Sequence, residues 1–435
     1  MPFYFTPPPY LLESPIGRTL YGDVPDALTI DSSLTLPDAC EIAIIGGGIA
    51  SIALATRLWH CNLLHQTIII EQASSLAETF FSRISKLRQR VMRSPYEHHV
   101  GAEYVRDCEM LDFARVNWRH LTDIERGEIR MAQSGQRSVV PVDVFCAYIR
   151  HAVEAHQIRH QVRRGHVNSV QVLGPHHFVL NIDGRHLTAR NVIWAVGDQA
   201  RPLPEWVKRG QSKKRVSHWE EPGQDDEIEH AVVVGAGMSA AHLLLNLREA
   251  GIRVTWIVRK QERYQCTDVN ALYFRPEGRS YFLRQSLAQR LECLQEQQRA
   301  SIMLEFEPIF RSWEEQGGLV VYRQTEVLDL EPDNDGVHLR LSNGMEVHTN
   351  HVYTAFGMHP VFSPPLISEG KALYQGRPYP LADDKTLELL NCPGAFVCGS
   401  LASLSIGPAA RNIDGARIAA DRIVSHLVQL QERKV

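Results

Sequence analysis

The stretch EIAIIGGGIASIALATRLW, residues 41–59, decides the fold of this chain. A short β-rich apolar run leads into three glycines, and the residues after them have the apolar spacing of a helix. Gly46 permits a tight reversal of the backbone, and Gly48 lets the main chain approach a pyrophosphate without a side chain between them. The helix that follows directs its first N–H groups at the same place, which favours an anion there.

A glycine turn of this kind also occurs for purely structural reasons, so the prediction needs support from other residues. Ser51 stands at the third position of G-x-G-x-x-G and is small enough for the helix to pack closely on the strand, although it departs from the Gly/Ala pattern. The next strand, TIIIE (67–71), ends at Glu71, about 20 residues further on, where an acid accepts hydrogen bonds from an adenosine ribose. Together these features predict a dinucleotide site.

A second glycine turn follows in HAVVVGAGMSAAHLLLNLREAG, residues 230–251. Gly235, Gly237 and Ala240 take the same three roles there. The strand after it, RVTWIVRK (253–260), ends in two basic residues and has no acid.

That basic pair, Arg259 and Lys260, indicates which nicotinamide cofactor would bind. A 2′-phosphate brings negative charge to this position, so the pair favours NADPH, whereas a carboxylate would favour NADH. The plainer interpretation is a solvated strand end. We predict NADPH.

The two halves of the chain repeat one order of elements, with the turns about 190 residues apart. Each half has a glycine-turn strand, a helix, a second strand, a β-meander and a strand that ends in Ala-x-Gly, at residues 195–197 and 355–357. This predicts an α/β protein with two Rossmann-like dinucleotide-binding domains and β-meander insertions. We place an N-terminal arm at 1–40, a discontinuous first domain at 41–225 and 350–435, and a second domain at 226–349.

Composition excludes several other classes of protein. The 435 residues carry a formal net charge of −4, without the basic excess of a nucleic-acid binder. The longest apolar run is too short to span a membrane, and the first twenty residues lack the basic start of a signal peptide. We therefore expect a cytoplasmic protein that contacts neither nucleic acid nor membrane.

The eight cysteines include no C-x-x-C pair, so a redox dithiol of short spacing is not predicted. We also predict no metal site. His156 and His160 have the i, i+4 spacing of helical ligands, but the arginines around them would repel a cation.

A third element comes late, in GAFVCGSLASLSIGPAARNIDGARIAADRIV (394–424). It resembles the terminal FAD segment of two-domain flavoproteins, with Gly399-Ser400 where those proteins have Gly-Asp. The resemblance implies that Ser400 hydrogen-bonds the ribityl chain, and that the helix from about Asp414 directs its N-terminus at the flavin.

Over residues 41–425 the chain resembles FAD- and NAD(P)H-dependent oxidoreductases, and within them the class B flavin-dependent (N-hydroxylating) monooxygenases. His218 matches the histidine of their F-x-G-x-x-x-H motif, although Lys214 replaces its glycine. The resemblance assigns the first turn to FAD and the second to NADPH. The implied FAD-binding residues are Gly46, Gly48, Ser51, Glu71, Arg93, Gly197, Gly399 and Ser400, and the implied NADPH-binding residues are Gly235, Gly237, Ser239, Ala240, Arg259, Lys260 and Gly357.

The resemblance further implies a monooxygenase in which reduced flavin and O2 form a C4a-(hydro)peroxyflavin that oxygenates, by N-hydroxylation, a small nucleophilic metabolite. No catalytic residue is assigned; Asn270 and Arg93 are the two weak candidates. A reductase that passes electrons to a protein or quinone, and a non-catalytic redox sensor, remain alternatives. For the first, Lys208, Arg209, Lys213, Lys214 and Arg215 offer a basic docking face. Formation of a homo-oligomer stays open.

Overall fold

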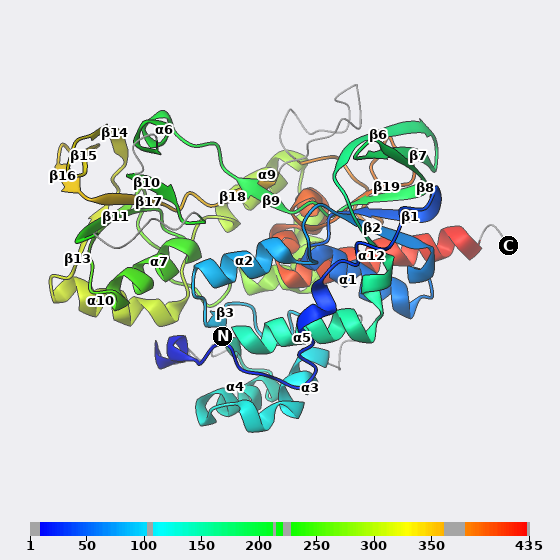
Figure 1. Ribbon diagram of the computed structural model, residues 1–435, viewed down its shortest axis with the longest axis horizontal. Helices are drawn as coiled ribbons and strands as arrows, with labels where there is room; N and C mark the ends of the chain where they lie inside the picture. Colours follow the sequence, from blue (N-terminus) through cyan, green and yellow to red (C-terminus); the bar gives the residue numbers. More distant parts are fainter. Residues whose placement is uncertain (1–8, 102–107, 212–214, 221–227, 361–378, 433–435) are drawn as a thin grey trace.

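The computed structural model describes residues 9–101, 108–211, 215–220, 228–360 and 379–432. Two bodies lie side by side along the long axis of the molecule, one built around β1 and the other around β11 (Figure 1). The expected boundary between residues 225 and 226 lies outside the described residues, as do Lys213 and Lys214.

The first body contains a mixed sheet in the order β5-β2-β1-β8-β7-β6, with β19 also paired to β8. Its strands are β1 (Ala39–Ile45), β2 (Thr67–Glu71), β5 (Val162–Arg164), β6 (Val167–Gly174), β7 (His177–Ile182), β8 (Arg185–Trp194) and β19 (Ala395–Val397). β1, β2, β5, β8 and β19 are parallel, and the predicted meander β6–β7–β8 continues the sheet in antiparallel fashion. The late segment thus joins the first sheet, as the resemblance implies.

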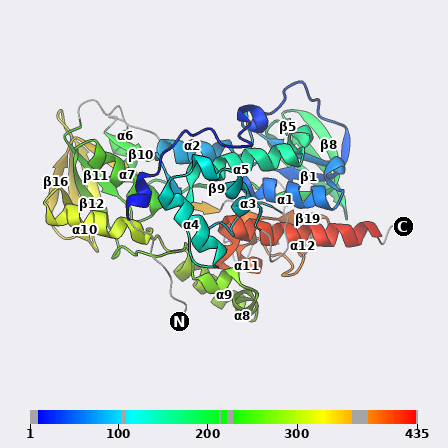
Figure 2. The same cartoon turned by 90° about the horizontal axis from the view of Figure 1, so that it is seen from below.

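Three helices cover one face of this sheet: α1 (Ile49–His60), α5 (Val142–Ala155) and α12 (Ile413–Glu432) (Figures 1 and 2). The apolar residues of β1 and β2 are buried, which explains why these strands read as continuous apolar runs. α1 packs directly on α12, so the first glycine-turn helix and the late segment share one core.

The second body contains a five-stranded parallel sheet in the order β10-β17-β11-β12-β13. These strands are β10 (Val216–His218), β11 (His230–Val234), β12 (Arg253–Val258), β13 (Leu319–Arg323) and β17 (His351–Thr354). A separate antiparallel sheet consists of β14 (Val327–Pro332), β15 (Val337–Leu341) and β16 (Glu346–Thr349).

Alternate residues of β11 belong to two different hydrophobic cores. Ala231 and Val233 pack in the core that includes helices α7 (Met238–Glu249) and α10 (Glu307–Glu315), whereas Val232 and Val234 pack in the core of the β14–β16 sheet. A strand covered on both faces must be apolar at every position, which is the pattern HAVVV.

The predicted domain limits need correction in two places. The pairing puts β10 and β17 in the second sheet, although we had assigned both segments to the first domain. The repeat itself gives the reason: β8 lies beside β1 and ends in Ala195-Val196-Gly197, and β17 lies beside β11 and ends in Ala355-Phe356-Gly357. The second body therefore extends past residue 349.

The remaining elements connect or flank these sheets. They are β3 (Val91–Met92), β4 (Val140–Pro141), β9 (Asp198–Ala200), β18 (Met358–Pro360), α2 (Glu78–Lys86), α3 (Glu109–Val116), α4 (Asp123–Gln133), α6 (Glu205–Gln211), α8 (Pro276–Leu283), α9 (Leu287–Gln297) and α11 (Ser403–Ile406). β9 and β18 follow Gly197 and Gly357, and they pair with each other where the chain crosses between the bodies. Among the described residues, no helix combines the length and apolarity needed to cross a membrane.

Residues 9–38 of the expected N-terminal arm are irregular apart from two short 3-10 turns. Arg18 fixes this segment on the first body through ion pairs to Glu125 at 2.7 Å and to Asp143 at 3.1 Å. Leu11, Leu12 and other apolar side chains of the segment are buried, so it forms part of the core rather than only a surface layer.

Candidate active site

The first glycine turn has one glycine that the fold requires and one that leaves space. Gly46 has φ +100°, and a Cβ there would lie 2.6 Å from the carbonyl oxygen of Ala195. Gly48 caps α1 with φ −75°, and a Cβ there would meet no described atom within 4 Å. The space in front of the helix N-terminus is therefore open, as a bound phosphate requires.

The side chains around this turn hold its backbone in place. Glu71 accepts hydrogen bonds from the amides of Gly47, at 2.5 Å, and Ala73, at 2.8 Å. Ser51 is fully buried and its hydroxyl donates to the carbonyl oxygen of Gly46. A hydroxyl at the third position thus bonds the first glycine, which accounts for the departure from the Gly/Ala pattern.

The other residues expected to contact the flavin follow parallel strands that end at the same edge of the first sheet. Gly197 follows β8 with φ +70°, and Gly399 follows β19 with φ +64°. Ser400 is 5% exposed, and its hydroxyl oxygen has no hydrogen-bond partner among the described residues. A buried hydroxyl without a partner is costly, so this edge of the sheet fits a polar ligand.

The second turn repeats the first. Gly235 has φ +141°, and a Cβ there would lie 2.4 Å from the carbonyl oxygen of Ala355. Gly237 caps α7, where the nearest atom to a Cβ would be the side chain of Ala300 at 3.8 Å. Ala240 is fully buried, as close packing of helix on strand requires.

Arg259 and Lys260 directly follow β12 and are both exposed. The Arg259 side chain is 72% exposed, and among the described residues it forms an ion pair with Glu326, at 3.7 Å. A surface ion pair of this length contributes little, which leaves the guanidinium available to an incoming anion.

A cleft of about 340 Å³ lies between the two bodies. It is lined by residues 237–239, 298–301 and 355–358 of the second body, and by Pro408, Arg411 and Asn412 of the late segment. Its charged lining residues are Arg93, Arg201, Arg299, Arg411 and Asp268. Arg93, Arg299 and Arg411 form ion pairs with Asp268, Glu296 and Asp198. The cleft is therefore lined by arginine side chains whose charges are largely paired, with the guanidinium of Arg201 in addition. Guanidinium groups are suited to contact the phosphates of a dinucleotide.

Arg93 lines the cleft and is held there by protein groups, and the phosphate contact that we expected of it stays a prediction. The side chain is buried, and it donates to the carbonyl oxygens of Ser301 at 3.2 Å and Thr267 at 2.6 Å, with Asp268 at 3.0 Å. Burial lowers the pKa of the guanidinium, and the Asp268 carboxylate opposes that shift. Arg93 therefore links the first body to loops of the second through its two terminal nitrogens, while its Nε has no hydrogen-bond partner among the described residues.

Two polar pairs at the cleft were missed by sequence reasoning. Arg411 donates to the Asp198 carboxylate, at 3.0 Å from Nε, and Asn412 donates to Asp268 at 2.6 Å. Asp198 directly follows the Ala-Val-Gly strand end, which was a usable signal. The partners are far apart in sequence, so spacing did not reveal the pairs.

Other candidate residues lie away from the cleft. Asn270 is exposed, and its side chain caps the 3-10 turn at Ala271–Phe274 instead of lining the cleft. His218 lies on β10, with Nδ1 at 3.6 Å from Glu220. His156 bonds the carbonyl oxygen of Ala152 and contacts His60, while His160 lies in a separate 3-10 turn.

The eight cysteines all lie among the described residues, and none is joined to another in a disulfide. Burial raises the pKa of Cys40, Cys146 and Cys398 to about 12. Exchange chemistry needs a thiolate, so these three buried thiols are poorly suited to it.

Residues 130–399 match the model of the pyridine nucleotide-disulphide oxidoreductase family. The chain belongs to this family. The matched segment contains the second glycine turn and both Ala-x-Gly strand ends. No curated protein sequence matches the chain.

Solved structures of similar fold cover nearly the whole chain. An ornithine N-hydroxylase of Kutzneria sp. 744 is 16% identical, with a TM-score of 0.72 over 91% of this chain and 100% of that one. An ornithine hydroxylase of Pseudomonas aeruginosa is 17% identical, with a TM-score of 0.70 over 90% and 99%. A cadaverine monooxygenase of Erwinia amylovora, bound to FAD, is 16% identical, with a TM-score of 0.69 over 91% and 95%. These likenesses show the fold that the two glycine turns predict.

Proposed function

We propose that this family member is an FAD-dependent, NADPH-using monooxygenase that oxygenates a small nucleophilic metabolite, by hydroxylation of an amine nitrogen. The observation that carries the proposal is the pair of open glycine turns with one arginine-lined cleft between the bodies. The similar structures include hydroxylases of ornithine and a monooxygenase of cadaverine, both of which are amines, and the Kutzneria enzyme is in complex with reduced FAD and NADP+.

The residues present fit both cofactors. Gly48, Glu71 and Ser400 would hold FAD through an open helix N-terminus, a carboxylate and an unpartnered hydroxyl. Gly237 and Ser239 of the cleft lining would hold NADPH together with Arg259, which follows β12. When bound, FAD accepts a hydride from NADPH and transfers oxygen from O2.

The chain itself would supply binding, orientation and shelter from water. Arg93 closes one side of the cleft because it joins Asp268 and Ser301 of the second body to the first body. Arg411 and Asn412 fix the late segment at the same cleft through Asp198 and Asp268. An internally paired lining of this kind would orient the bound cofactors and limit the access of solvent to the reacting atoms.

The reductase alternative has less support. Among the described residues of the basic cluster, Lys208 and Arg209 are ion-paired with Glu205 and Asp329. Arg215 donates to the carbonyl oxygen of Asn334 at 3.1 Å. These contacts reduce the charge available to an acidic partner protein.

The test is to load the protein with FAD, supply NADPH and O2, and add ornithine, lysine, cadaverine or a sulfide one at a time. The proposal predicts that one amine yields a hydroxylamine and lowers the peroxide released per NADPH consumed. Stoichiometric peroxide with every compound would reject the monooxygenase in favour of a reductase. A colourless protein that FAD cannot reconstitute would reject the flavoprotein altogether.

A further inference from the structure

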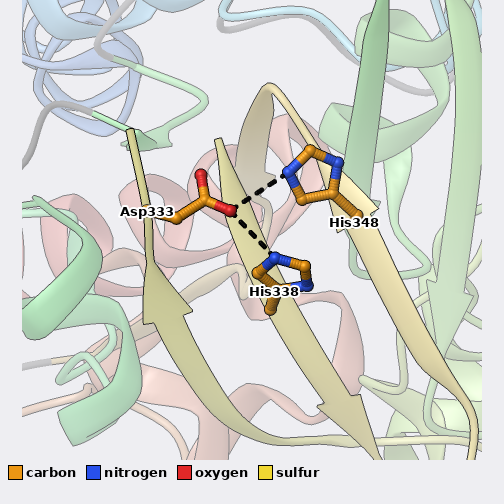
Figure 3. A group of neighbouring side chains, drawn as sticks. All are labelled: Asp333, His338 and His348. Atoms are coloured by element: carbon orange, nitrogen blue, oxygen red, sulfur yellow. Dashed lines mark ion pairs between the residues drawn. The ribbon is translucent and has the colours of Figure 1, made fainter. Parts of the chain in front are cut away.

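Two histidines lie opposite each other on the small antiparallel sheet of the second body. His338 on β15 and His348 on β16 are register partners, and their ring centroids are 4.6 Å apart. Asp333 directly follows β14, and its carboxylate points at both rings (Figure 3). All three side chains are exposed.

The atoms that these residues present have the spacing of a metal site. Asp333 Oδ2 lies 2.8 Å from His338 Nε2 and 3.4 Å from His348 Nε2, and the three atoms all lie within 4.8 Å of one another. Ligands 2.0–2.1 Å from a tetrahedral Zn²⁺ are separated by about 3.3 Å. Small movements of exposed rings would bring the three atoms to that distance.

The backbone around Asp333 aims its carboxylate. The other oxygen, Oδ1, accepts hydrogen bonds from the amides of Asp335 at 2.9 Å and Gly336 at 2.6 Å. A Cβ on Gly336 would lie 2.2 Å from the carbonyl oxygen of Thr349, so the glycine lets this turn approach β16. Supporting hydrogen bonds of this kind orient ligands in metal sites.

We propose that Asp333, His338 and His348 bind one Zn²⁺ ion, with water as the fourth ligand. Two imidazole nitrogens and one carboxylate oxygen suit this borderline cation, whereas Mg²⁺ and Ca²⁺ prefer oxygen ligands alone. Local spacing in the sequence did not reveal the site, because cross-strand pairing brings the two histidines together.

The position of the site indicates a stabilising role. The β14–β16 sheet lies at the far end of the second body from β1 (Figure 1). Its buried residues share a core with β11 and β12 of the five-stranded sheet. Because the ion would link the turn after β14 to two neighbouring strands, we expect it to raise thermal stability and leave cofactor chemistry unchanged.

The test compares Zn²⁺ binding by the metal-stripped full-length protein, the double variant His338→Ala/His348→Ala, and Asp335→Asn. Asp335 lies in the same turn, but its carboxylate is not one of the three ligands. By isothermal titration, the wild type and Asp335→Asn should each bind one more equivalent of Zn²⁺ than the double variant. Only those two proteins should show a rise in Tm on addition of Zn²⁺.

Cobalt provides a second measurement, because Co²⁺ at a tetrahedral site has characteristic visible bands. The wild type minus double variant difference spectrum should contain such bands, and NADPH oxidation should be equal in all three proteins. Equal Zn²⁺ stoichiometry and a featureless difference spectrum would reject the site, and the cluster would then be a surface His–Asp ion pair. Neither result depends on the proposed monooxygenase activity.

Discussion

Gly48 and Gly46 lie two positions apart, yet the structure predicts opposite consequences for replacing each with alanine. At Gly48 the new methyl group would meet no described atom within 4 Å and φ is −75°, which any residue adopts. We expect Gly48→Ala to change the free energy of unfolding by about 1 kcal/mol or less. The methyl group would instead occupy the space proposed for the pyrophosphate.

The expected loss of FAD affinity follows from the contacts that the methyl group would displace. Hydrogen bonds from backbone amides to a charged phosphate contribute about 1.5–3 kcal/mol each. Loss of two of them at the N-terminus of α1 would cost about 3–6 kcal/mol, or roughly a hundredfold to ten-thousandfold in Kd. Gly48→Ala should therefore be folded and colourless.

Gly46→Ala is the matched comparison. Its Cβ would lie 2.6 Å from the Ala195 carbonyl oxygen, and φ is +100°. Strain at positive φ and overpacking each cost about 1–3 kcal/mol, so the variant should be destabilised by about 2–6 kcal/mol.

Urea unfolding of the apoproteins and fluorescence titration with FAD separate the two effects. The reasoning is refuted if Gly48→Ala binds FAD as the wild type does, or if it loses as much stability as Gly46→Ala.

Two further predictions concern charge. Replacing both Arg259 and Lys260 with glutamine should raise the KM for NADPH by about tenfold and leave that for NADH nearly unchanged; equal changes in steady-state assays would exclude a 2′-phosphate contact. Burial raises the pKa of Glu128 from 4.5 to about 7, against the hydrogen bond from the Val139 amide and the charge of Arg137. Between pH 4.5 and about pH 7 the folded protein keeps the proton on Glu128, whereas the unfolded chain releases it. The free energy of unfolding therefore falls by at most about 3 kcal/mol as the pH rises through this range. Glu128→Gln should raise Tm above pH 7 and have little effect below pH 4.5, and calorimetry showing the wild-type pH dependence in this variant would contradict the assignment.

The sequence predicts those features that depend on neighbours along the chain. Gly46, Gly235 and the two Ala-x-Gly ends follow apolar strands at fixed spacing, so the repeat and both turns could be recognised directly. Parallel pairing of β1, β8 and β19 then brings their ends to one edge of the sheet. The boundary at residue 349 separated β17 from its own sheet, although the repeat already indicated that β17 is the equivalent of β8.

The walls of the cleft could not be predicted in the same way. Arg93 and Ser301 are 208 residues apart, and Arg411 and Asp198 are 213 residues apart. Each pair joins segments that are far apart in the sequence and meet only in the folded chain. From its charge alone, Arg93 was predicted to contact a phosphate. Its hydrogen bonds to the carbonyl oxygens of Ser301 and Thr267 could not be predicted from the sequence.

The crossing between the bodies links the two halves of the repeat to the cleft. Gly197 directly precedes β9 and Gly357 directly precedes β18, the two strands of the β9–β18 pair. Both glycines have a left-handed backbone, with φ +70° and +76°, so the two crossing segments leave their sheets through the same conformation. Asp198 begins β9 and accepts hydrogen bonds from Arg411, which also donates to the carbonyl oxygen of Met358 on β18. One arginine of the late segment thus contacts both crossing strands. The distance between the two proposed cofactor sites therefore depends on this ribbon as well as on the glycine turns, because any change in its pairing would shift one body relative to the other.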